Sequence, residues 1–440
     1  MQLKQKGIRF AIHTLGCKVN TYESDAMAEK LRAAGLTECD FEETADVYVI
    51  NTCTVTNIAD RKSRQMLRRA RRLNPDALIV AAGCYVDDAV KNDRLEELIS
   101  DRVIDVAVSN KDKNKIVELI NERINIFGDN DLLKPEKLQD NPFITELDGH
   151  SRAFIKVQDG CNMYCSYCII PYVRGPLKRR PLEDIAKEVG LLAESRTAEI
   201  VITGIHLSSL GNGILDIISE IEKFDGIKRV RLGSLEPKLI TEEFAAELAS
   251  HKKLCPHFHL SLQSGNDEIL KKMNRHYTAE EYAQRCGILR KAFDHPAITT
   301  DIIVGFPGET EAQFESTCAF AERIGFYEAH IFKYSRRRGT PADRMDGQLS
   351  DAQKSARSER LMEICGRMSH DFRQYYIGKE VSFLSEELVS IGGRTYETGF
   401  TPEYVRCLRP SSEVHQNEII SGKASQIIHE NDIDEALLLV

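Results

Sequence analysis

The stretch DGCNMYCSYCIIPYVRG, residues 159–175, carries cysteines at positions 161, 165 and 168. We call Cys161, Cys165 and Cys168 the motif trio. Three thiols are an odd number for disulfides and one short of the four ligands that close a zinc or iron–sulfur site. A closed zinc site is the alternative, but the stretch contains no fourth cysteine and no histidine. The motif therefore predicts a metal centre that keeps one position free for a substrate or cofactor.

The composition is that of an ordinary globular protein. The chain has 440 residues, 42% hydrophobic and 29% charged, which is enough for about three domains. The N-terminal segment MQLKQKGIRFAIHTLGCKVN has only a short apolar run, so we expect neither a signal peptide nor a membrane span. We therefore expect a cytoplasmic protein without a membrane partner, whose twelve cysteines are ligands or buried thiols rather than disulfides.

Residues 1–140 alternate between apolar runs typical of strands and amphipathic runs typical of helices. The expected strands are IRFAIHTLGC (8–17), DVYVINTC (46–53), ALIVAAGC (77–84) and DVAVSN (105–110). The expected helices are 21–35, 57–73 before Asn74-Pro75, one that ends near Ile99, and 113–124. This alternation predicts an N-terminal open, mostly parallel α/β domain.

Cys17, Cys53 and Cys84, the upstream trio, each stand at the end of an expected strand. In a parallel sheet the carboxyl ends of the strands lie along one edge, where ligands bind. Three cysteines in equivalent positions predict a second three-thiol site at that edge. The alternative is that each is a small buried hydrophobic residue.

Residues 128–150 are polar, contain two prolines and are expected to be a linker to a second domain at 147–375. The expected strands of this domain are 153–161, 199–206, 228–237, 257–265, 297–310 and 328–335. Six strand–helix units are fewer than the eight of a closed barrel. We therefore expect a partial (β/α)6 barrel whose site lies at the carboxyl ends of its strands, with the motif trio following the first strand.

The last segment, 376–440, alternates apolar and polar residues between glycine turns. The pattern is clearest at GKEVSFLSEE (378–387) and NEIISGKASQII (417–428), and it predicts a small antiparallel β-barrel. Because the segment is fairly acidic, RNA contact here would depend on Arg394, Tyr404 and Arg406. A packing lid is the alternative.

Basic residues are concentrated in three groups, although the net charge is −9. A charge run is usually a solvated helix face. Cations placed together with almost no acids repel one another, however, so stability alone would not favour this arrangement. Binding of a phosphate backbone would favour it. The groups are Arg61, Lys62, Arg64, Arg68, Arg69, Arg71 and Arg72; Arg174, Lys178, Arg179 and Arg180; and Lys333, Arg336, Arg337 and Arg338.

The CxxxCxxC spacing of the motif trio, followed by IIPYVRG, resembles the radical S-adenosylmethionine (SAM) enzymes. TLGCKVNTYES (14–24), INTCTVT (50–56) and AAGCYV (81–86) resemble the N-terminal domain of the methylthiotransferases in that superfamily. LGSLEP (232–237), HLSLQSG (259–265), MNRHYT (273–278) and DIIVGFPGET (301–310) match as well, and the C-terminal barrel resembles the RNA-binding TRAM domain. The resemblance covers nearly the whole chain.

This resemblance implies two [4Fe-4S] clusters and S-adenosylmethionine as cofactors. The motif trio would hold the cluster that cleaves S-adenosylmethionine to a 5′-deoxyadenosyl radical, and the upstream trio a second cluster that carries sulfur on its open iron. The implied reaction inserts this sulfur, with a methyl group from another S-adenosylmethionine, at an unactivated carbon. The implied metal ligands are Cys17, Cys53, Cys84, Cys161, Cys165 and Cys168, and the last three are also the expected catalytic residues.

Polar residues at the strand ends are expected to bind S-adenosylmethionine, because they would point into the barrel mouth; core capping is the alternative. The relatives often carry two glycines and a glutamate after the second barrel strand, where Thr203-Gly204-Ile205-His206 stands here. The residues that would contact the amino group of S-adenosylmethionine at this place therefore depart from the family pattern. The expected cofactor-binding residues are Tyr167, Thr203, Ser234, Glu236, Gln263, Arg275 and Asp301.

The family modifies tRNA or a ribosomal protein, and the basic groups favour tRNA. TLGCKVN resembles the branch that acts on C2 of N6-threonylcarbamoyladenosine at position 37, because the isopentenyladenosine branch usually has glutamine and methionine at the places of Lys18 and Val19. We expect the anticodon stem-loop and an electron donor such as a flavodoxin as partners, with the sulfur donor unknown. The alternatives are an isopentenyladenosine or ribosomal-protein substrate and, as a different class, a non-catalytic RNA-binding iron–sulfur protein. The expected RNA-binding residues are Arg61, Arg64, Arg68, Arg69, Arg72, Arg179, Arg180, Arg336 and Arg337.

Overall fold

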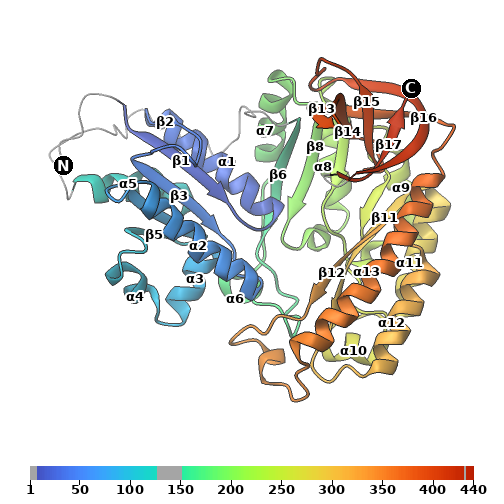
Figure 1. Cartoon of the computed structure of the whole chain (residues 1–440), viewed down its shortest axis with the longest axis horizontal. Helices are drawn as coiled ribbons and strands as arrows, with labels where there is room; N and C mark the ends of the chain where they lie inside the picture. The colour runs from blue at the N-terminus through green and yellow to red at the C-terminus, as the bar shows by residue number, and fades with distance from the viewer. Residues whose placement is uncertain (1–6, 126–150, 431–432) are drawn as a thin grey trace. The chain divides into compact units, whose positions relative to one another are not determined.

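The computed structural model describes residues 7–125, 151–430 and 433–440 (Figure 1). The chain forms two compact units. Unit 1 comprises Met1–Thr145, Asp159–Lys178 and Ser335–Asp343, and unit 2 comprises Glu146–Gln158, Arg179–Tyr334 and Arg344–Val440. The domain boundaries 1–140, 147–375 and 376–440 stay a prediction, and the expected linker 128–150 lies outside the described residues.

Unit 1 is built on a five-stranded parallel sheet with the order β2-β1-β3-β4-β5. The strands are β1 (Arg9–Thr14), β2 (Thr37–Glu38), β3 (Val47–Thr52), β4 (Leu78–Gly83) and β5 (Val106–Val108). The order reverses between β1 and β3, which is the switch point at which doubly wound sheets bind ligands. The predicted parallel α/β domain is confirmed, and the short edge strand β2 is an addition that the sequence pattern did not indicate.

Helices cover both faces of this sheet. Alternate residues of β3 point to opposite faces, so Val49 packs in one core and Ile50 in the other. This gives a strand buried on both sides, as is typical of parallel sheets. The helices are α1 (Lys18–Ala33) and α5 (Ile116–Asn125) on the Val49 face, and α2 (Asn57–Leu73), α3 (Cys84–Lys91) and α4 (Leu95–Ser100) on the Ile50 face, with α6 (Ile170–Arg174) farther along the chain.

Unit 2 begins with six parallel strands that form an open barrel. They are β6 (Arg152–Asp159), β8 (Glu199–Gly204), β9 (Arg229–Leu232), β10 (His257–His259), β11 (Ala297–Val304) and β12 (Glu328–Lys333), with the short β7 (Lys178–Arg179) beside β6. Parallel bridges from Val230 to Leu254 and from Leu235 to Leu260 join the β6–β9 sheet to the β10–β12 sheet. Over the described ranges β6 and β12 do not pair, so the predicted partial barrel is confirmed.

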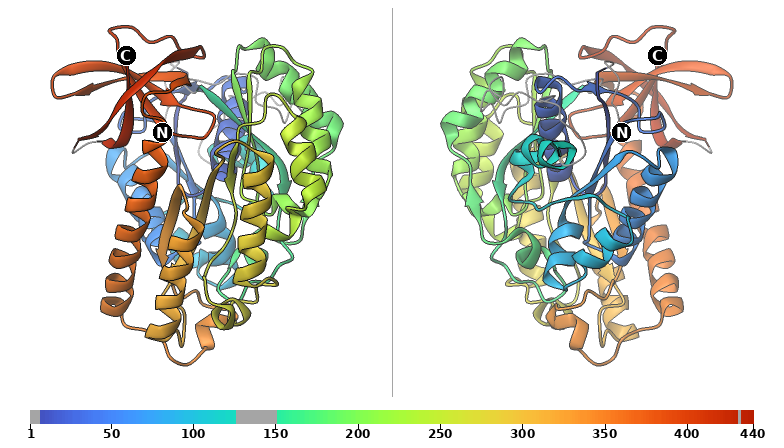
Figure 2. Two further views of the ribbon diagram at one scale, coloured as in Figure 1. Left: turned by 90° about the vertical axis from the view of Figure 1, so that its right-hand side faces the viewer. Right: turned by 90° about the vertical axis from the view of Figure 1, so that its left-hand side faces the viewer.

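Helices follow the strands of this barrel and lie outside them (Figure 2). Three of them begin with a capping box, in which Thr278, Thr310 and Ser350 each accept a hydrogen bond from a backbone NH three residues later. The helices are α7 (Leu182–Glu194), α8 (Gly213–Glu222), α9 (Glu242–Ser250), α10 (Asp267–Lys272), α11 (Ala279–Ala292), α12 (Glu311–Ile324) and α13 (Asp351–Gln374).

The C-terminal part of unit 2 is a closed barrel with the order β13-β14-β15-β17-β16. Its strands are β13 (Glu380–Ile391), β14 (Arg394–Phe400), β15 (Arg406–Pro410), β16 (Ile419–Glu430) and β17 (Ile433–Leu439). The predicted barrel is confirmed, and its pairs are antiparallel except β15–β17, which is parallel.

Buried charges join this closed barrel to the open barrel. The Arg231 side chain is 1% exposed, pairs with Glu199 at 2.9 Å and donates to the Thr401 carbonyl at 3.3 Å. The guanidinium groups of Arg152 and Arg231 stack on the Tyr404 ring, 5.0 and 4.7 Å from its centre. Tyr404 thus packs one barrel onto the other, a role that the expected RNA contact did not include.

Glu397 makes the stability of the closed barrel depend on pH. Its buried carboxylate accepts hydrogen bonds from the Ser385 hydroxyl (2.6 Å), the His415 backbone NH (2.7 Å) and the Arg409 guanidinium (2.5 Å). Burial opposes ionisation, but these donors outweigh it and lower the pKa of Glu397 from 4.5 to about 2. Because the folded state favours the charged form, this stability is present above pH 4.5 and is lost as the pH falls toward 2.

We therefore expect the hydrogen-exchange protection of β14, corrected for intrinsic rates, to fall between about pH 5 and pH 2. Glu397→Gln should lower the protection at neutral pH and flatten this dependence. The matched control Glu413→Gln removes an exposed carboxylate from the same barrel and should change neither. An undiminished acid dependence in Glu397→Gln would contradict the assignment.

Candidate functional site

The upstream trio lies at the carboxyl edge of the unit 1 sheet. Cys17 is the N-cap residue of α1 after β1, Cys53 directly follows β3, and Cys84 begins α3 after β4. These three strands are neighbours in the sheet order, and the first two flank its switch point. Cys17 is exposed, whereas Cys53 and Cys84 are buried. The edge therefore presents one thiol to solvent and two toward the interior.

Cys53 lies beside the loop that carries Cys17. A side chain on Gly16, whose φ is +107°, would stand 3.0 Å from the Cys53 Sγ atom. Burial raises the pKa of the Cys53 thiol to about 11, and the Cys84 and Cys17 thiols add to this rise. The structure thus places the upstream trio after the ends of neighbouring strands, and a cluster shared by its thiols stays a prediction.

Buried polar side chains hold the loops that carry these thiols. The Asn20 amide donates to the Leu15 carbonyl at 2.7 Å and to the Thr52 carbonyl at 3.0 Å, which ties the ends of β1 and β3 together. The Ser63 hydroxyl of α2 donates to the Cys53 carbonyl at 3.0 Å and accepts its NH at 3.2 Å. Sequence reasoning missed these residues, because they lie inside α1 and α2 rather than at the strand ends that they hold.

The motif trio lies on the loop between β6 and α6, and this loop belongs to unit 1. Cys165 is buried, and Cys161 and Cys168 are half-buried. The Cys168 NH donates to the Cys165 carbonyl at 3.0 Å, which folds the last two thiols into one turn. Gly160 has φ +70°, and a side chain there would lie 2.1 Å from the Pro176 carbonyl oxygen, so only glycine fits the start of the loop.

Arg174 fastens this loop to α1 inside unit 1. Its side chain is 1% exposed and donates to Asn20 at 2.6 Å, to Glu23 at 2.9 Å and to Asp159 at 3.1 Å. Glu23 is also paired with the buried Lys113. Arg174 belongs to a group expected to face phosphate, but its charge instead neutralises two carboxylates within the protein.

The elements that carry the two trios also pack directly against each other. Cys84 of the upstream trio shares a hydrophobic cluster with Ile169 and Val173, which follow Cys168. The Asn110 amide donates to the Cys84 Sγ atom and to the Val173 carbonyl, both at 3.4 Å. Both trios are therefore parts of one compact unit.

Arg337 is a second buried anchor in unit 1. Its side chain is 6% exposed and donates to Asp60 (2.9 Å), Asn57 (2.9 Å) and Thr54 (2.7 Å) at the beginning of α2. The expectation that Arg337 binds RNA at the surface is therefore wrong, because its guanidinium neutralises the buried Asp60.

The other expected RNA-binding residues differ in how free they are. On α2, which begins at the Thr56 cap, Arg61, Arg68, Arg69 and Arg72 are exposed and Arg64 is half-buried. Among the described residues, no acid lies within ion-pair distance of Arg61, Arg64, Arg68 or Arg72. The remaining residues have internal partners: Arg69 pairs with Glu42, Arg180 with Glu188 and Arg336 with Asp343, and Arg179 donates to the Ser209 carbonyl.

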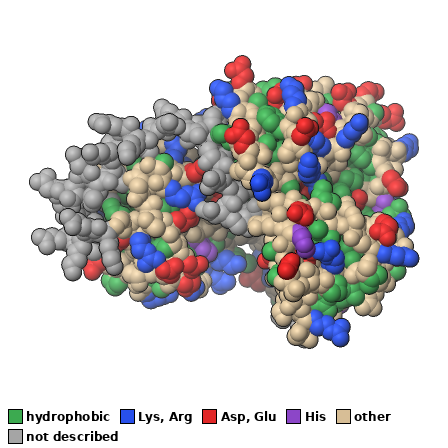
Figure 3. All heavy atoms as spheres, turned by 90° about the horizontal axis from the view of Figure 1, so that it is seen from above, with side chains coloured by type: hydrophobic (Ala, Val, Ile, Leu, Met, Phe, Trp, Pro, Cys, Tyr) green, Lys and Arg blue, Asp and Glu red, His purple; other side chains and the backbone are tan. Residues whose placement is uncertain are grey.

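One face of the molecule is of mixed charge. On the face drawn in Figure 3, Lys and Arg side chains lie among Asp and Glu side chains. A net charge of −9 is therefore compatible with a basic stripe on a single helix.

The residues expected to bind S-adenosylmethionine lie in unit 2, except Tyr167, which lies in unit 1. Glu236 and Arg275 meet in an ion pair of 2.5 Å, although 39 positions separate them. The Gln263 NH donates to the Asp301 carbonyl at 2.8 Å, which joins the ends of neighbouring strands. Thr203 is buried at the end of β8, and Ser234 is exposed after β9.

Gln158, which the sequence analysis missed, organises the segment that departs from the family pattern. Its side-chain oxygen accepts the His206 NH at 2.6 Å. This contact holds the turn Thr203–His206 against the end of β6.

Comparisons with known proteins now identify the family. The Radical SAM superfamily profile matches residues 155–321, and the profile of uncharacterized protein family UPF0004 matches residues 9–106. The threonylcarbamoyladenosine tRNA methylthiotransferase MtaB of Bacillus subtilis is 38% identical over 429 residues, covering 94% of this chain and 93% of the relative. The chain belongs to the radical SAM methylthiotransferase family.

Other methylthiotransferases are similar over most of their length. An MtaB protein of Aquifex aeolicus is 36% identical, covering 86% of this chain and 92% of the relative. A tRNA-2-methylthio-N(6)-dimethylallyladenosine synthase of Thermodesulfovibrio yellowstonii is 33% identical, covering 96% and 97%. The solved radical SAM methyltransferase TsrM of Kitasatospora setae shares the fold, with a TM-score of 0.57, 16% identity and 77% of each chain covered.

This methylthiotransferase is a transferase that uses S-adenosylmethionine and a [4Fe-4S] cluster, as its superfamily implies. Within the described ranges, no helix has the length and apolar character needed to cross a bilayer.

Proposed function

We propose that this enzyme transfers a methylthio group to C2 of N6-threonylcarbamoyladenosine at position 37 of tRNA. The observation that carries the proposal is full-length similarity to relatives named for this activity. Four such relatives are 35–38% identical, whereas four named for dimethylallyladenosine are 33–34% identical. The presence of both cysteine trios in one compact unit supports the same conclusion.

The motif trio would hold the cluster that binds S-adenosylmethionine. Its residues fit this group, because three cysteines lie on one loop while no fourth cysteine follows in the stretch 159–175. When bound, this centre supplies one-electron cleavage of S-adenosylmethionine to a 5′-deoxyadenosyl radical. Arg174 and Gly160 set the path of the loop, so their part is to position the thiols.

The upstream trio would hold a second [4Fe-4S] cluster, the source of the transferred sulfur. Three thiols at the switch point fit a centre with one open position, as at the motif trio. The buried Cys53 thiol must lose its proton to become a ligand, because only thiolates bind metal.

Glu236 and Arg275 would orient S-adenosylmethionine. Their carboxylate and guanidinium groups suit the ribose hydroxyls and the charged methionine part of the cofactor. Other polar residues remain proposed contacts of S-adenosylmethionine because of their polarity and their position near the strand ends. They are Tyr167, Thr203, Ser234, Gln263 and Asp301. A one-electron donor such as a flavodoxin would complete the reductive step.

The anticodon stem-loop would dock on the exposed arginines of α2. Arg61, Arg64, Arg68 and Arg72 lack an acidic partner among the described residues, so their charge is available to phosphates. Four further arginines are proposed as RNA contacts, each of which must give up an internal partner to bind a phosphate. They are Arg179 and Arg180 on unit 2 and Arg69 and Arg336 on unit 1.

Replacing Arg64, Arg68 and Arg72 together with alanine should weaken binding of the anticodon stem-loop. The slope of log affinity against log salt should flatten by about 2–3, because each lost phosphate contact removes roughly one released counterion. Filter binding at several salt concentrations measures this slope.

The matched control removes three exposed arginines that already have acidic partners, by replacing Arg323, Arg360 and Arg367 with alanine. It lowers the net charge equally and should leave the slope unchanged. Equal slopes in the two triple variants would show that the α2 arginines are a solvated helix face and do not contact RNA phosphates.

Nucleoside mass spectrometry tests the function itself. Reconstituted enzyme with dithionite and S-adenosylmethionine should convert threonylcarbamoyladenosine in tRNA to its 2-methylthio form and leave dimethylallyladenosine unchanged. Product from the dimethylallyl substrate alone would establish the alternative. Failure to form 5′-deoxyadenosine would favour a non-catalytic RNA-binding protein.

A further inference from the structure

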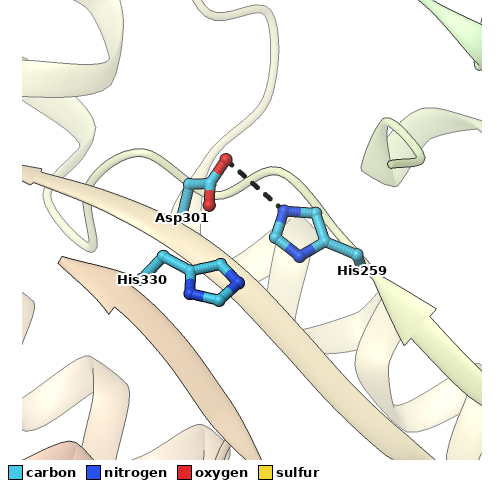
Figure 4. Close-up of side chains that lie close together, drawn as sticks. All are labelled: His259, Asp301 and His330. Carbon is cyan, nitrogen blue, oxygen red and sulfur yellow. Dashed lines mark ion pairs between the residues drawn. The ribbon is translucent and has the colours of Figure 1, made fainter. Parts of the chain in front are cut away.

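Two histidines and one aspartate converge on the β10–β12 sheet of unit 2, a unit that contains neither cysteine trio (Figure 4). His259 ends β10, Asp301 lies in β11 and His330 lies in β12. Each offers one ligand atom, and these atoms all lie within 4.8 Å of one another. We call these residues the His–Asp–His group.

The register of the parallel strands produces this convergence. His259 is the partner of Thr299, and Asp301 is the partner of His330. Partners in neighbouring strands share a face, and residues two apart in one strand also share it. The opposite face carries Phe258, which packs on Phe293 behind the sheet. The His–Asp–His group therefore lies on the face turned away from that apolar layer.

His259 is held in a metal-binding orientation. Its Nδ1 atom is 3.0 Å from the Thr299 hydroxyl oxygen, whereas its buried Nε2 atom has no hydrogen-bond partner in the described structure. The Asp301 carboxylate oxygen lies 3.5 Å from Nε2, which is near the separation of two ligands on one ion with bonds of about 2.0–2.1 Å. A hydrogen bond at the far ring nitrogen is the usual means of fixing a ligating histidine.

The group is open on one side. The His259 side chain is 13% exposed and that of Asp301 is 31% exposed, while His330 at the outer strand is exposed. The two imidazole rings are nearly parallel, at 24°, with centres 5.9 Å apart. An ion can therefore enter from the His330 side, and a modest rotation of that exposed ring would bring its nitrogen closer to Asp301.

We propose that His259, Asp301 and His330 bind one divalent transition-metal ion. Two imidazoles with one carboxylate suit zinc or ferrous iron, whereas magnesium and calcium prefer all-oxygen sites. Three protein ligands leave at least one position of the ion open toward solvent, where water or an anionic oxygen of a ligand binds. The proposal uses none of the proposed cluster ligands and stands independently of the tRNA substrate. It assigns the Asp301 carboxylate to the ion in place of the contact with S-adenosylmethionine named above.

Zinc binding to the enzyme with both clusters loaded tests the proposal. After chelator treatment and gel filtration, the protein is dialysed anaerobically against buffered Zn²⁺, and zinc and iron are counted by elemental analysis. The wild type should bind one zinc ion beyond its iron. His330→Ala and Asp301→Asn should weaken this binding at least about tenfold, and Thr299→Val about tenfold through loss of the hydrogen bond to His259.

The matched control is His251→Ala, since His251 pairs with the carboxylate of Glu222 at 2.9 Å and belongs to no group of three ligand residues in the described part of the chain. It should bind zinc like the wild type. His330 is exposed, so its replacement leaves packing intact, and unchanged iron content and circular dichroism confirm this.

X-ray absorption at the zinc edge identifies the ligands. Nitrogen and oxygen near 2.0–2.1 Å support the proposal, and sulfur near 2.3 Å would place the zinc on cysteines and overturn it. Equal zinc uptake by His330→Ala and the wild type, or no uptake by either, would also overturn it.

Discussion

Cys165→Ala should abolish formation of 5′-deoxyadenosine, whereas Cys53→Ala should keep part of it and lose the methylthio product. Cys165 is a proposed ligand of the centre that cleaves S-adenosylmethionine, and Cys53 is a proposed ligand of the sulfur-carrying cluster. Chromatography of the two products after reduction with dithionite measures both effects in one reaction. Iron analysis should show that each variant loses about half of the iron of the wild type.

Cys286→Ala is the matched control, because Cys286 is a buried thiol of α11 outside both trios. It should keep both activities and the full iron content. If Cys165→Ala and Cys53→Ala lost both products to the same extent, the two trios would not have separate roles.

Arg174→Ala should destabilise unit 1 and lower the occupancy of both iron sites. The change removes the buried cation that Glu23 and Asp159 share and leaves Glu23 with Lys113 alone, and a broken buried ion pair costs about 3–5 kcal/mol. Hydrogen exchange measured by mass spectrometry should show faster exchange in residues 159–178 and at the beginning of α1. The iron content per chain should fall as this exchange becomes faster, because the loop that carries the motif trio loses its attachment to α1.

Arg179→Ala is the control for this prediction, since Arg179 is an exposed arginine five positions farther along the chain. It should leave the exchange of residues 159–178 and the iron content unchanged. Exchange in Arg174→Ala equal to that of the wild type would show that the buried network does not hold the loop.

Local patterns were sufficient for most of the helices and strands and for the position of each cysteine after its strand. Residues such as Val49 and Ile50 alternate between two cores, and a cysteine follows each of β1, β3 and β4, so the sheet and its thiol-bearing edge follow from periodicity. The open barrel follows from counting its strands. The short strand β2 and the parallel β15–β17 pair did not follow, because tertiary packing decides them.

The basic residues show the limit of sequence reasoning at the site. Arg174 and Arg337 stand in basic groups, but Glu23, which pairs with Arg174, is 151 positions away and Asp60, which pairs with Arg337, is 277 positions away. Charge density along a sequence does not reveal such distant partners. The α2 arginines, in contrast, have few acids near them either in the sequence or in the described structure. The His–Asp–His group was equally hidden, because only strand register brings its members together.

The assignment of residues 159–178 to unit 1 has a consequence for dividing this protein into expression fragments. A recombinant core that starts after the linker would carry its thiol-bearing loop without the carboxylate of Glu23 and the amide of Asn20. That loop would then be a ready substrate for proteases and for air oxidation. Crystallisation or cell-free work on the SAM-cleaving half should therefore retain the N-terminal sheet, as a co-expressed partner if not in the same chain.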